Sequence, residues 1–504
     1  DDLTFAGSDF SGVTLFDGGD DMDTADGFVD VLTFAGSSGA LVGVNVQNWE
    51  QVVIDSGAAI SFSDGMLTAG TLAIGSGMLD ASGSGLVFTG NLSNGGMITM
   101  QDGAAGDMVT VSGAYSGAGM LLVDVDLASD TSDMLVVQGN VASSTTVIGL
   151  TDVTTGAATG NNVVVVDVAG ATAAGDFALA GGPIASGVYV YDLALADTAW
   201  VLASGVNASG AVYEALPLVL GGFNTLPTFG QRMRQRSSTE DQPLWLRISA
   251  DRVEATPESM SGFSYESDQM ELQVGADFAL APGAMGGWVI GATLQYGQIN
   301  ADVQNALGRG GIDAKGYGIG ATATFYGSNG TYVDLQGQSS WIESDLTSST
   351  DGNLAAGHSS RTYALSAEVG HRISFGEGSA FIPQAQLTWG RVEGESFTDS
   401  ADNAVDPVSN DSKVARLGVA YHSDITERSQ FHVIGNLLRD LSDPQSIQVN
   451  GGELSVTADD TWAEIGIGGN FALSANQLLF GEANYRQSLD GGESSAAGFS
   501  VGFK

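Results

Sequence analysis

The sequence GYGIGATATFYG, residues 316–327, alternates apolar or aromatic side chains with glycine and threonine. In an extended strand this places Tyr317, Ile319 and Phe325 on one face and small or polar side chains on the other. Strands of soluble sheets are usually shorter. Strict alternation over about 9 to 11 residues is typical of a membrane barrel strand, because one face meets lipid and the other lines a polar lumen.

Other late stretches alternate in the same way, among them MELQVGADFAL, RTYALSAEVGHR and WAEIGIGGNF. About twelve such segments follow residue 243, and single-chain bacterial barrels close with even numbers of strands. Roughly 260 residues leave about 22 for each strand and its connection, which suits short turns at one end and longer loops at the other. The sequence predicts a twelve-stranded antiparallel transmembrane β-barrel over residues 243–504. Its strands begin near Leu244, Met270, Trp288, Ile312, Thr331, Arg361, Ala380, Lys413, Phe431, Trp462, Gln477 and Ala496. The acidic stretches SSTDGNLAAGHSS, DSADNAVDPVSND and DLSDPQSIQVNGG are its predicted long loops.

The charge of the chain is strongly asymmetric. It holds 16 lysines and arginines against 59 acidic residues, a formal net charge of −43, and the first basic residue is Arg232. Such a surface repels nucleic acid and anionic lipid headgroups, because both contacts depend on lysine and arginine. Cysteine is absent, which excludes disulfides and thiolate metal sites. No run of about 20 apolar residues is present, so we expect no membrane-spanning helix.

Short repeats dominate the first part of the chain. LTFAG occurs at residues 3–7 and again at 32–36, and GDMVTVSG at 106–113 is echoed by SDMLVVQG at 132–139. Each unit is a polar turn followed by a short β-rich run and glycine, too short to bury an apolar face unless units stack. The sequence therefore predicts an all-β protein in which a right-handed parallel β-helix precedes the barrel. A β-sandwich of short strands is the alternative.

A linker with three arginines joins the two parts. The stretch AVYEALPLVLGGFNTLPTFGQRMRQR, residues 211–236, predicts one or two apolar turns near Tyr213, then a helix capped by Asn224 or Thr225 that runs through Pro227. Even when only partly helical, the stretch is long enough to thread a barrel. The predicted plug consists of Asn224 with Arg232, Arg234 and Arg236, and its predicted acidic partners in the lumen are Glu271, Asp277, Glu368 and Glu464, with Glu482 a further candidate. A solvated linker between domains is the alternative.

In this order, the parts resemble the monomeric autotransporters of Gram-negative bacteria, the type V secretion systems. YEALPLVLGGFNTLPTFGQRMRQR followed by LWLRISADR resembles the family's linker and first barrel strand, and SDMLVVQGN resembles its last passenger rungs. GVYVYDLALADTAWVLAS, residues 187–204, resembles its autochaperone segment, with Tyr191, Leu193, Trp200 and Leu202 at matching positions. The predicted domains are a β-helical passenger fragment over 1–186, an autochaperone-like end over 187–210, a linker inside the pore over 211–242 and the barrel.

The resemblance implies an outer-membrane barrel that exports and displays its own passenger, an adhesin-like or structural surface protein. Its implied partners are outer-membrane lipid, the barrel-assembly machinery, periplasmic chaperones and an unidentified host or surface ligand. Phe499, Val501 and Phe503 resemble the C-terminal signal for barrel insertion, although family members commonly end on an aromatic residue rather than on Lys504. Members that cleave themselves inside the pore carry an Asn-Asn pair in the linker, whereas Asn224 stands alone, so we do not expect that cleavage. The first residues lack the features of a signal peptide, and we expect a processed or truncated chain.

No enzymatic site is evident from the sequence. Without Cys, His, Lys or Arg before Arg232, the first part offers no Ser-His pair and no thiolate. A surface hydrolase that uses two carboxylates, or whose active part lies upstream, is the alternative function. A passive porin is a third reading, which requires the arginines to leave the pore. We expect no cofactor; the alternative is calcium held by Asp17, Asp20, Asp21, Asp23, Asp26 and Asp30.

Overall fold

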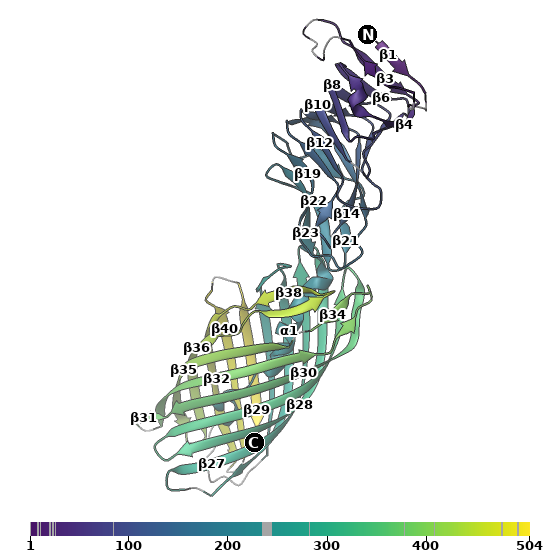
Figure 1. Cartoon of the computed structure of the whole chain (residues 1–504). Helices are drawn as coiled ribbons and strands as arrows, with labels where there is room; N and C mark the ends of the chain where they lie inside the picture. Colours follow the sequence, from purple (N-terminus) through teal and green to yellow (C-terminus); the bar gives the residue numbers. More distant parts are fainter. Residues whose placement is uncertain are drawn as a thin grey trace. The chain divides into compact units, whose positions relative to one another are not determined.

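The computed structural model describes residues 2–504 except 8–9, 11, 20–21, 23–24, 26, 84, 234–243, 282, 377, 408, 475–476 and 491–492. The chain forms two compact units, Asp1–Gly205 and Val206–Lys504, which are described separately (Figure 1). In the described part of the chain, no helix combines the length and the apolar character that crossing a membrane requires.

The first unit is a β-solenoid whose strands, most of them parallel, stack into two long sheets (Figure 1). One sheet contains β1 (Asp2–Phe5), β3 (Val31–Ala35), β6 (Gln51–Asp55), β8 (Met66–Ile74), β10 (Leu86–Asn94), β12 (Met108–Val111), β13 (Tyr115–Gly117), β16 (Met134–Val137), β17 (Val141–Ser144), β19 (Val163–Val168), β21 (Ile184–Ser186), β22 (Tyr189–Ala196) and β23 (Ala199–Val206). The other contains β4 (Ser38–Leu41), β7 (Ala59–Phe62), β9 (Met78–Asp80), β11 (Met97–Thr99), β14 (Met120–Asp126), β15 (Thr131–Ser132), β18 (Thr146–Asp152) and β20 (Phe177–Leu179). Two short strands, β2 (Phe16–Asp17) and β5 (Val46–Gln47), pair with each other, and the 3-10 turn Gly43–Asn45 precedes β5.

The sequence repeats stack on one another in register. Phe5 of β1 lies beside Phe34 of β3, and Met108 of β12 lies beside Met134 of β16. Alternate residues point inward, so that Leu32 and Phe34 are completely buried. Each short strand covers the apolar face of the next, which is why units that cannot fold alone form a continuous core. The predicted parallel β-helix is confirmed in its architecture, and the β-sandwich alternative is wrong.

Asp133 holds together a turn of this solenoid. Its completely buried carboxylate accepts backbone N–H bonds from Gly106 and Asp107 at 2.9 Å and from Asp124 at 2.7 Å. Burial raises the pKa of the Asp133 carboxyl, while the three backbone donors act in the opposite direction. The side chain therefore takes the place of the backbone acceptors that the turn lacks.

Replacing Asp133 with alanine should destabilise the first unit by about 3 kcal/mol, because three buried N–H groups lose their acceptor. Urea denaturation of the whole chain, followed by the fluorescence of Trp49 and Trp200, measures this loss. Asp102→Ala is the matched control, since Asp102 is exposed and accepts a bond from Ala104. An equal loss of unfolding free energy in the two variants would contradict this role of Asp133.

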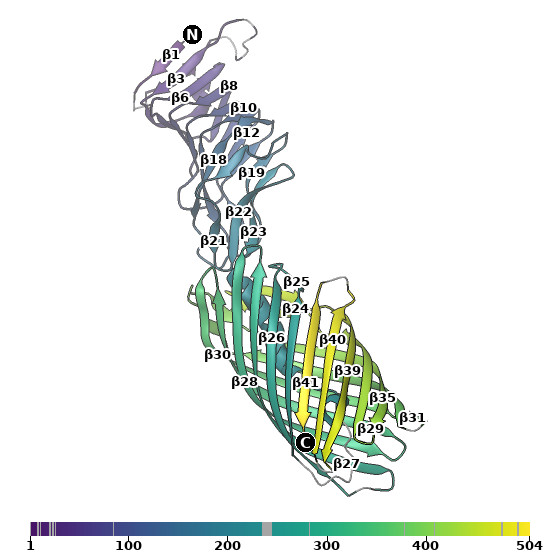
Figure 2. The ribbon, with the colours of Figure 1, turned by 180° about the vertical axis from the view of Figure 1, so that it is seen from behind.

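The second unit is a closed antiparallel barrel of twelve long strands within the described residues. Closure comes from the pairing of β24 with β41, which Figure 2 shows, and of β30 with β32. The strands are β24 (Leu244–Ala255), β26 (Ser264–Ala279), β27 (Gly286–Asn305), β28 (Gly308–Gly327), β29 (Thr331–Ser348), β30 (Gly352–His371), β32 (Ser379–Gly394), β35 (Asn410–Thr426), β36 (Ser429–Asp440), β39 (Thr461–Ser474), β40 (Gln477–Ser488) and β41 (Ser495–Phe503); the short β31 (Ile373–Phe375) continues β30 and pairs with β32.

The two faces of the barrel differ as the alternation predicts. Outward-facing side chains such as Ile319 and Leu365 are more than half exposed. Inward-facing side chains such as Thr324, Asp334 and Glu368 are buried and polar. An exposed apolar outer band around a polar interior is the pattern of a barrel in a bilayer.

One end of the barrel carries an additional small sheet. It consists of β25 (Glu258–Ser259), β33 (Phe397–Thr398), β34 (Ala404–Asp406), β37 (Gln445–Val449) and β38 (Gly452–Thr457). We call this end the loop end, and the opposite end, where β24 begins and β41 finishes, the turn end. The stretch SSTDGNLAAGHSS, predicted as a long loop, is wrong because from Gly352 on it belongs to β30. The other two predicted loops, DSADNAVDPVSND and DLSDPQSIQVNGG, are also wrong in part, because they contain β34 and β37 of the small sheet. Their apolar runs are too short to span a membrane but long enough to pair with each other.

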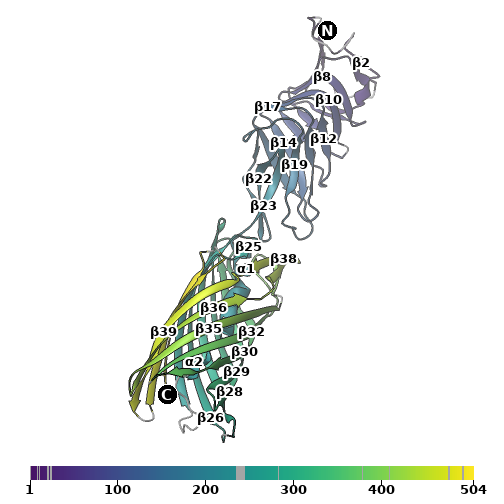
Figure 3. The same ribbon diagram turned by 90° about the vertical axis from the view of Figure 1, so that its left-hand side faces the viewer.

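The linker is helical in a different place from the prediction. Its longer helix, α1 (Ala208–Gly221), precedes the glycine pair, contains Pro217 and is capped by Asn207, whose side chain accepts a bond from the Gly210 N–H. The 3-10 turn Gly222–Asn224 follows, and then the short α2 (Phe229–Met233). The predicted cap at Asn224 or Thr225 is wrong, since Thr228 accepts the bond from the Gln231 N–H. Figure 3 places both helices inside the ring of strands.

Candidate functional site: the occupied barrel lumen

The helix α1 is buried on nearly all sides within the barrel. Twelve of its 14 residues are buried, and it contacts β27, β28 and β29 as well as β37 and β38 of the loop-end sheet. A helix that is apolar around its whole circumference is stable only when it is enclosed. Enclosure also explains why the helix continues through Pro217, which would cost about 3 kcal/mol in an exposed helix.

Glycines on the barrel wall allow this close approach. A β-carbon placed on Gly310 would lie 2.2 Å from Cγ2 of Val212, and one on Gly316 would lie 3.0 Å from the ring of Phe223. Larger residues at these positions would push the linker away from β28. The glycines that the alternating pattern placed on the lumen face therefore shape a groove for the linker.

Two consecutive residues of α1 bind the loop end. The Tyr213 hydroxyl donates to Oδ2 of Asp399 at 2.6 Å, and Asp399 also accepts a bond from the Asn403 side chain. The carboxylate of Glu214, completely buried, accepts the backbone N–H groups of Met260 and Ser261, each at 3.0 Å. Separate loops thus hold two consecutive residues of one helical turn.

Replacing Glu214 with alanine should weaken the folded barrel by about 1–3 kcal/mol, because the two N–H groups lose their acceptor. The temperature at which the compact, heat-modifiable form is lost on a gel should fall. Glu214→Gln keeps an acceptor oxygen, so its transition temperature should lie between those of the alanine variant and the wild type. A Gln variant as weak as the alanine variant would show that the acceptor is not what matters.

In the middle of the lumen, glutamines of the wall bind the non-helical part of the linker. Backbone carbonyls of Gly222, Phe223 and Pro227 accept bonds from the side chains of Gln269, Gln338 and Gln336, at 3.1, 2.8 and 2.8 Å. Irregular backbone away from water needs such partners. Asn224 lies here too, and its side chain donates to the Arg391 carbonyl at 3.2 Å.

Near the turn end, α2 is fixed by charge. The buried guanidinium of Arg232 pairs with the carboxylate of Asp334 and also donates to Thr324 at 3.2 Å. The Phe229 ring stacks on Tyr332 with ring centres 4.0 Å apart, and the Phe229 N–H donates to Glu368. A buried ion pair with these neighbours fixes the position of α2 more specifically than apolar contact alone would.

The four carboxylates named from the sequence as partners of the linker arginines all point into the barrel, yet each has another partner. Glu271 pairs with Arg247 at 3.3 Å, Glu368 pairs with Arg416 at 3.0 Å, Asp277 accepts a bond from Trp245 at 2.7 Å, and Glu464 accepts one from Asn436 at 2.6 Å. Glu482 accepts bonds from Gln231 and lies 2.9 Å from His432.

The partner of Arg232 that the sequence analysis missed is Asp334. Its signal is in TYVDLQGQ, where Tyr332, Asp334 and Gln336 alternate onto the lumen face. Arg234 and Arg236 lie outside the described residues.

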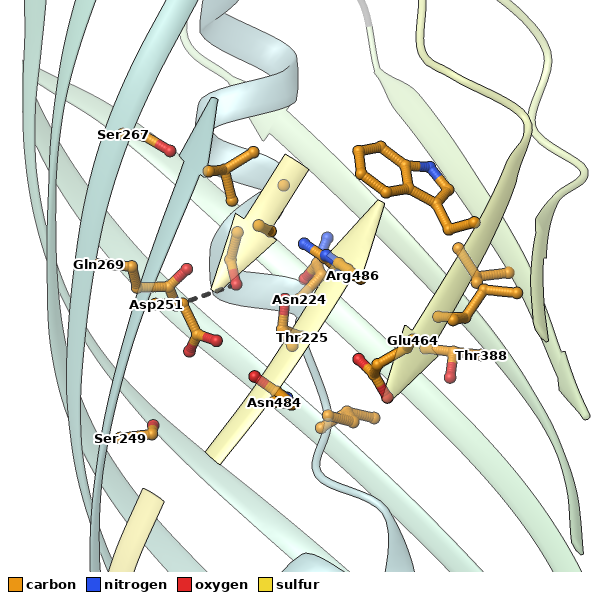
Figure 4. A pocket seen from close by; sticks show the side chains of 18 of the residues that line it. Asn224, Thr225, Ser249, Asp251, Ser267, Gln269, Thr388, Glu464, Asn484 and Arg486 are labelled. Atoms are coloured by element: carbon orange, nitrogen blue, oxygen red, sulfur yellow. Dashed lines mark hydrogen bonds between the residues drawn. The ribbon is translucent and has the colours of Figure 1, made fainter. Parts of the chain in front are cut away.

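Beside the linker the lumen is not filled. A cavity of about 390 Å³ lies between the non-helical stretch and the wall formed by β24, β39, β40 and their neighbours. Figure 4 shows Asp251, Glu464 and Arg486 among the side chains that line it. Its walls carry charges of both signs, which suits water rather than an apolar ligand.

The remaining residues named from the sequence lie apart from the lumen. Tyr191 and Leu202 are completely buried in the last strands of the solenoid, Leu193 is half-buried, and Trp200 donates to Thr172 and packs on Phe177. The C-terminal residues Phe499, Val501 and Phe503 point outward from β41 and are about half exposed.

Among the acidic residues weighed for calcium, the Asp17 carboxylate accepts bonds from the Gly19 N–H and Asn48, and Asp30 is buried. Asp20, Asp21, Asp23 and Asp26 lie outside the described residues. Within the part of the chain that the structure describes, no three His, Cys, Asp or Glu side chains gather around one metal position.

Comparison with known proteins separates the barrel from the solenoid in the same way as the structure does. The family model of the autotransporter β-domain matches residues 244–484, and that of the type 1 autochaperone domain matches residues 84–193. The autochaperone match begins well before Gly187 and ends at Leu193, so it covers Tyr191 but neither Trp200 nor Leu202.

Among the known proteins to which the chain is similar are two curated relatives and one solved structure. The adhesin BmaC autotransporter of Brucella suis biovar 1 is 31% identical over 326 residues, which are 58% of this chain and 9% of the relative. The probable autotransporter YfaL of Escherichia coli K12 is 27% identical over 457 residues, 81% of this chain and 36% of the relative. The chain therefore spans only a small part to about a third of these relatives. The crystal structure of the transport unit of the autotransporter AIDA-I from Escherichia coli superposes with a TM-score of 0.51 and 15% identity, over 59% of this chain and 98% of that one.

Proposed function

Because the chain belongs to the classical monomeric autotransporters and its barrel is a Gram-negative outer-membrane barrel, we propose that the barrel exports the solenoid that precedes it and holds it at the cell surface. In this proposal the loop end faces the outside and the turn end faces the periplasm.

One observation carries the proposal. The segment that follows the solenoid enters the lumen at the loop end, where the Val206 carbonyl accepts a bond from Asn305, and reaches Asp334 near the turn end before β24 begins. Within the second unit, the linker therefore begins at the loop end with Val206, while the first barrel strand begins at the turn end. That connectivity is the expected end state of export through the barrel.

Folding of the solenoid outside provides a driving force without a nucleotide. Stacked rungs fold progressively from one end, and each folded rung opposes return through the pore. The acidic passenger, which has no lysine or arginine, resists collapse while it is extended because its charges repel one another.

Insertion of the barrel is proposed to depend on β41. Phe499, Val501 and Phe503 present an outward aromatic and apolar row that the assembly machinery would recognise. Changing all three to serine should sharply lower the amount of heat-modifiable barrel in outer-membrane fractions, while the same change at three outward residues of β27, Trp288, Ile290 and Leu294, is the control. Unchanged amounts in the β41 variant would contradict this role.

For the exported solenoid we propose an adhesive or structural role rather than catalysis. The name of the relative BmaC supports adhesion, and residues 1–231 contain no Cys, His, Lys or Arg for covalent catalysis. A hydrolase that uses two aspartates is the alternative. Turnover of polysaccharide by displayed protein, lost on Asp→Asn changes, would favour the hydrolase.

Surface labelling tests export. An epitope inserted at Gly103, an exposed turn position, should be reached by antibody on intact cells that make the whole chain. A chain without residues 495–504 should leave the epitope inaccessible until cells are opened, because the barrel cannot close. Equal labelling of both chains on intact cells would contradict export through this barrel.

A further inference from the structure

An arginine lies among aromatic rings on the outer surface of the barrel. Arg361 of β30 is exposed, and its guanidinium carbon lies 4.9 Å from the ring centre of Trp341 on β29 and 5.1 Å from that of Tyr363. Tyr317 of β28 stacks on the other side of Trp341, with ring centres 5.7 Å apart. The rings fix the position of the cation from two sides.

This cluster marks the edge of the lipid-facing band. From it toward the turn end, the outward positions of β28, β29 and β30 are mostly apolar, with Ile319, Leu335 and Leu365 all more than two-fifths exposed; Ser339 of β29 is a polar exception. Toward the loop end they become polar, beginning with Lys315 and Glu343, which lie opposite each other in register. Aromatic residues at such a boundary are typical of the level of the lipid headgroups.

Arg361 has one acidic neighbour, Glu393 of β32, which lies opposite it in register but pairs with Arg391 at 2.9 Å. Arg252, Arg391 and Arg439, also on barrel strands and more than a third exposed, each lie within 4.0 Å of at least one carboxylate oxygen. Among the described residues, no carboxylate pairs with Arg361, although the chain carries far more acidic than basic residues. A cation beside hydrocarbon is costly unless an anion compensates it.

We propose that Arg361, flanked by Trp341 and Tyr363, binds the phosphate of a lipid headgroup in the leaflet at the loop end. The planar guanidinium presents parallel N–H donors that match two phosphate oxygens, and the rings pack against the first acyl carbons. The net charge of −43 repels anionic headgroups in general, and this position is a local exception. Only the assignment of the leaflet as the outer one rests on the proposed function.

Native mass spectrometry of the whole chain tests the site. The protein is exchanged into nanodiscs of phosphatidylcholine with a minor fraction of phosphatidic acid, and phosphatidic acid retained after release is counted. Arg361→Gln should retain about tenfold less than the wild type, about 1.4 kcal/mol, and Arg361→Lys an intermediate amount. Arg252→Gln is the matched control, because Arg252 is already paired with Asp268, and it should retain the wild-type amount.

Two results would overturn the inference. One is equal retention by the wild type and Arg361→Gln, and the other is an equal loss in Arg252→Gln, which would indicate a general effect of charge. Inorganic phosphate alone, at millimolar concentration, should not displace the lipid; displacement would show that the site takes free phosphate instead. None of these outcomes depends on surface labelling of the solenoid, so failure of the lipid site and failure of export are distinguishable.

Discussion

Removing residues 1–233 should convert a nearly closed barrel into an open pore. In the folded protein, α1, the glycine turn and α2 occupy the lumen from the loop end to Asp334, leaving beside them a cavity of about 390 Å³. Without this segment only the polar wall remains, and water and ions would fill it. We expect single-channel conductance in planar bilayers to rise severalfold over that of the whole chain.

The control for this experiment is a chain that begins at Val206. It lacks the solenoid but keeps the complete plug, so its conductance should match that of the whole chain. Similar currents in all three proteins would rule out the plug and would favour the porin reading.

Breaking the ion pair at the turn end should have the largest effect of any single substitution in the lumen. Arg232→Gln leaves the completely buried carboxylate of Asp334 without its cation, and Asp334→Asn leaves the guanidinium without its anion. Removing one partner of a buried pair typically costs about 3–5 kcal/mol. Each single variant should therefore lose the heat-modifiable form at clearly lower temperature, and its channel should flicker open more often.

The double variant Arg232→Gln with Asp334→Asn should recover part of this loss, because no isolated buried charge remains. The exposed pair of Arg252 with Asp268 is the control, since neutralising Arg252 should cost less than about 1 kcal/mol. Additive losses in the double variant would mean that the two side chains act independently.

The barrel was predictable from sequence because alternation is a local property of each strand. The side chain at each position, such as Ile319 or Thr324, indicates whether that position faces lipid or the lumen. A shift of one residue in strand register would turn every apolar side chain toward the lumen. The solenoid was predictable for a related reason, since each repeat, such as that around Phe5 and Phe34, stacks in register on its neighbour.

The linker was less predictable because enclosure overrides local preference. Pro217 and the glycine pair argue against a helix at α1 in water, yet the helix forms with twelve of its 14 residues buried. The face of each lumen carboxylate could also be predicted, but its partner could not. Whether Asp334 or Glu368 meets Arg232 depends on the depth that α2 reaches, which no local pattern encodes.

The loop-end sheet illustrates a further limit of sequence analysis. Its strands come from three separate connections, and β38 pairs with β25 from a segment almost 200 residues earlier. Such pairing depends on the closed barrel, which brings its loops together. Alternation in SIQV and ELSV is too short to indicate it.

The most direct test of the account is a disulfide between the linker and the barrel wall. The chain has no cysteine, so Ser209→Cys with Ser348→Cys introduces a single pair. The two hydroxyl oxygens, one on α1 and one on β29, lie 2.7 Å apart in the buried lumen, and sulfur in their places would be close enough to form a disulfide. We expect the bond to form in folded protein from cells, detected by mass spectrometry of linked peptides, and to be absent when Ser209→Cys is combined with Ile319→Cys on the outer face of β28. Folded barrel without the 209–348 bond would contradict the claim that the linker lies in the lumen.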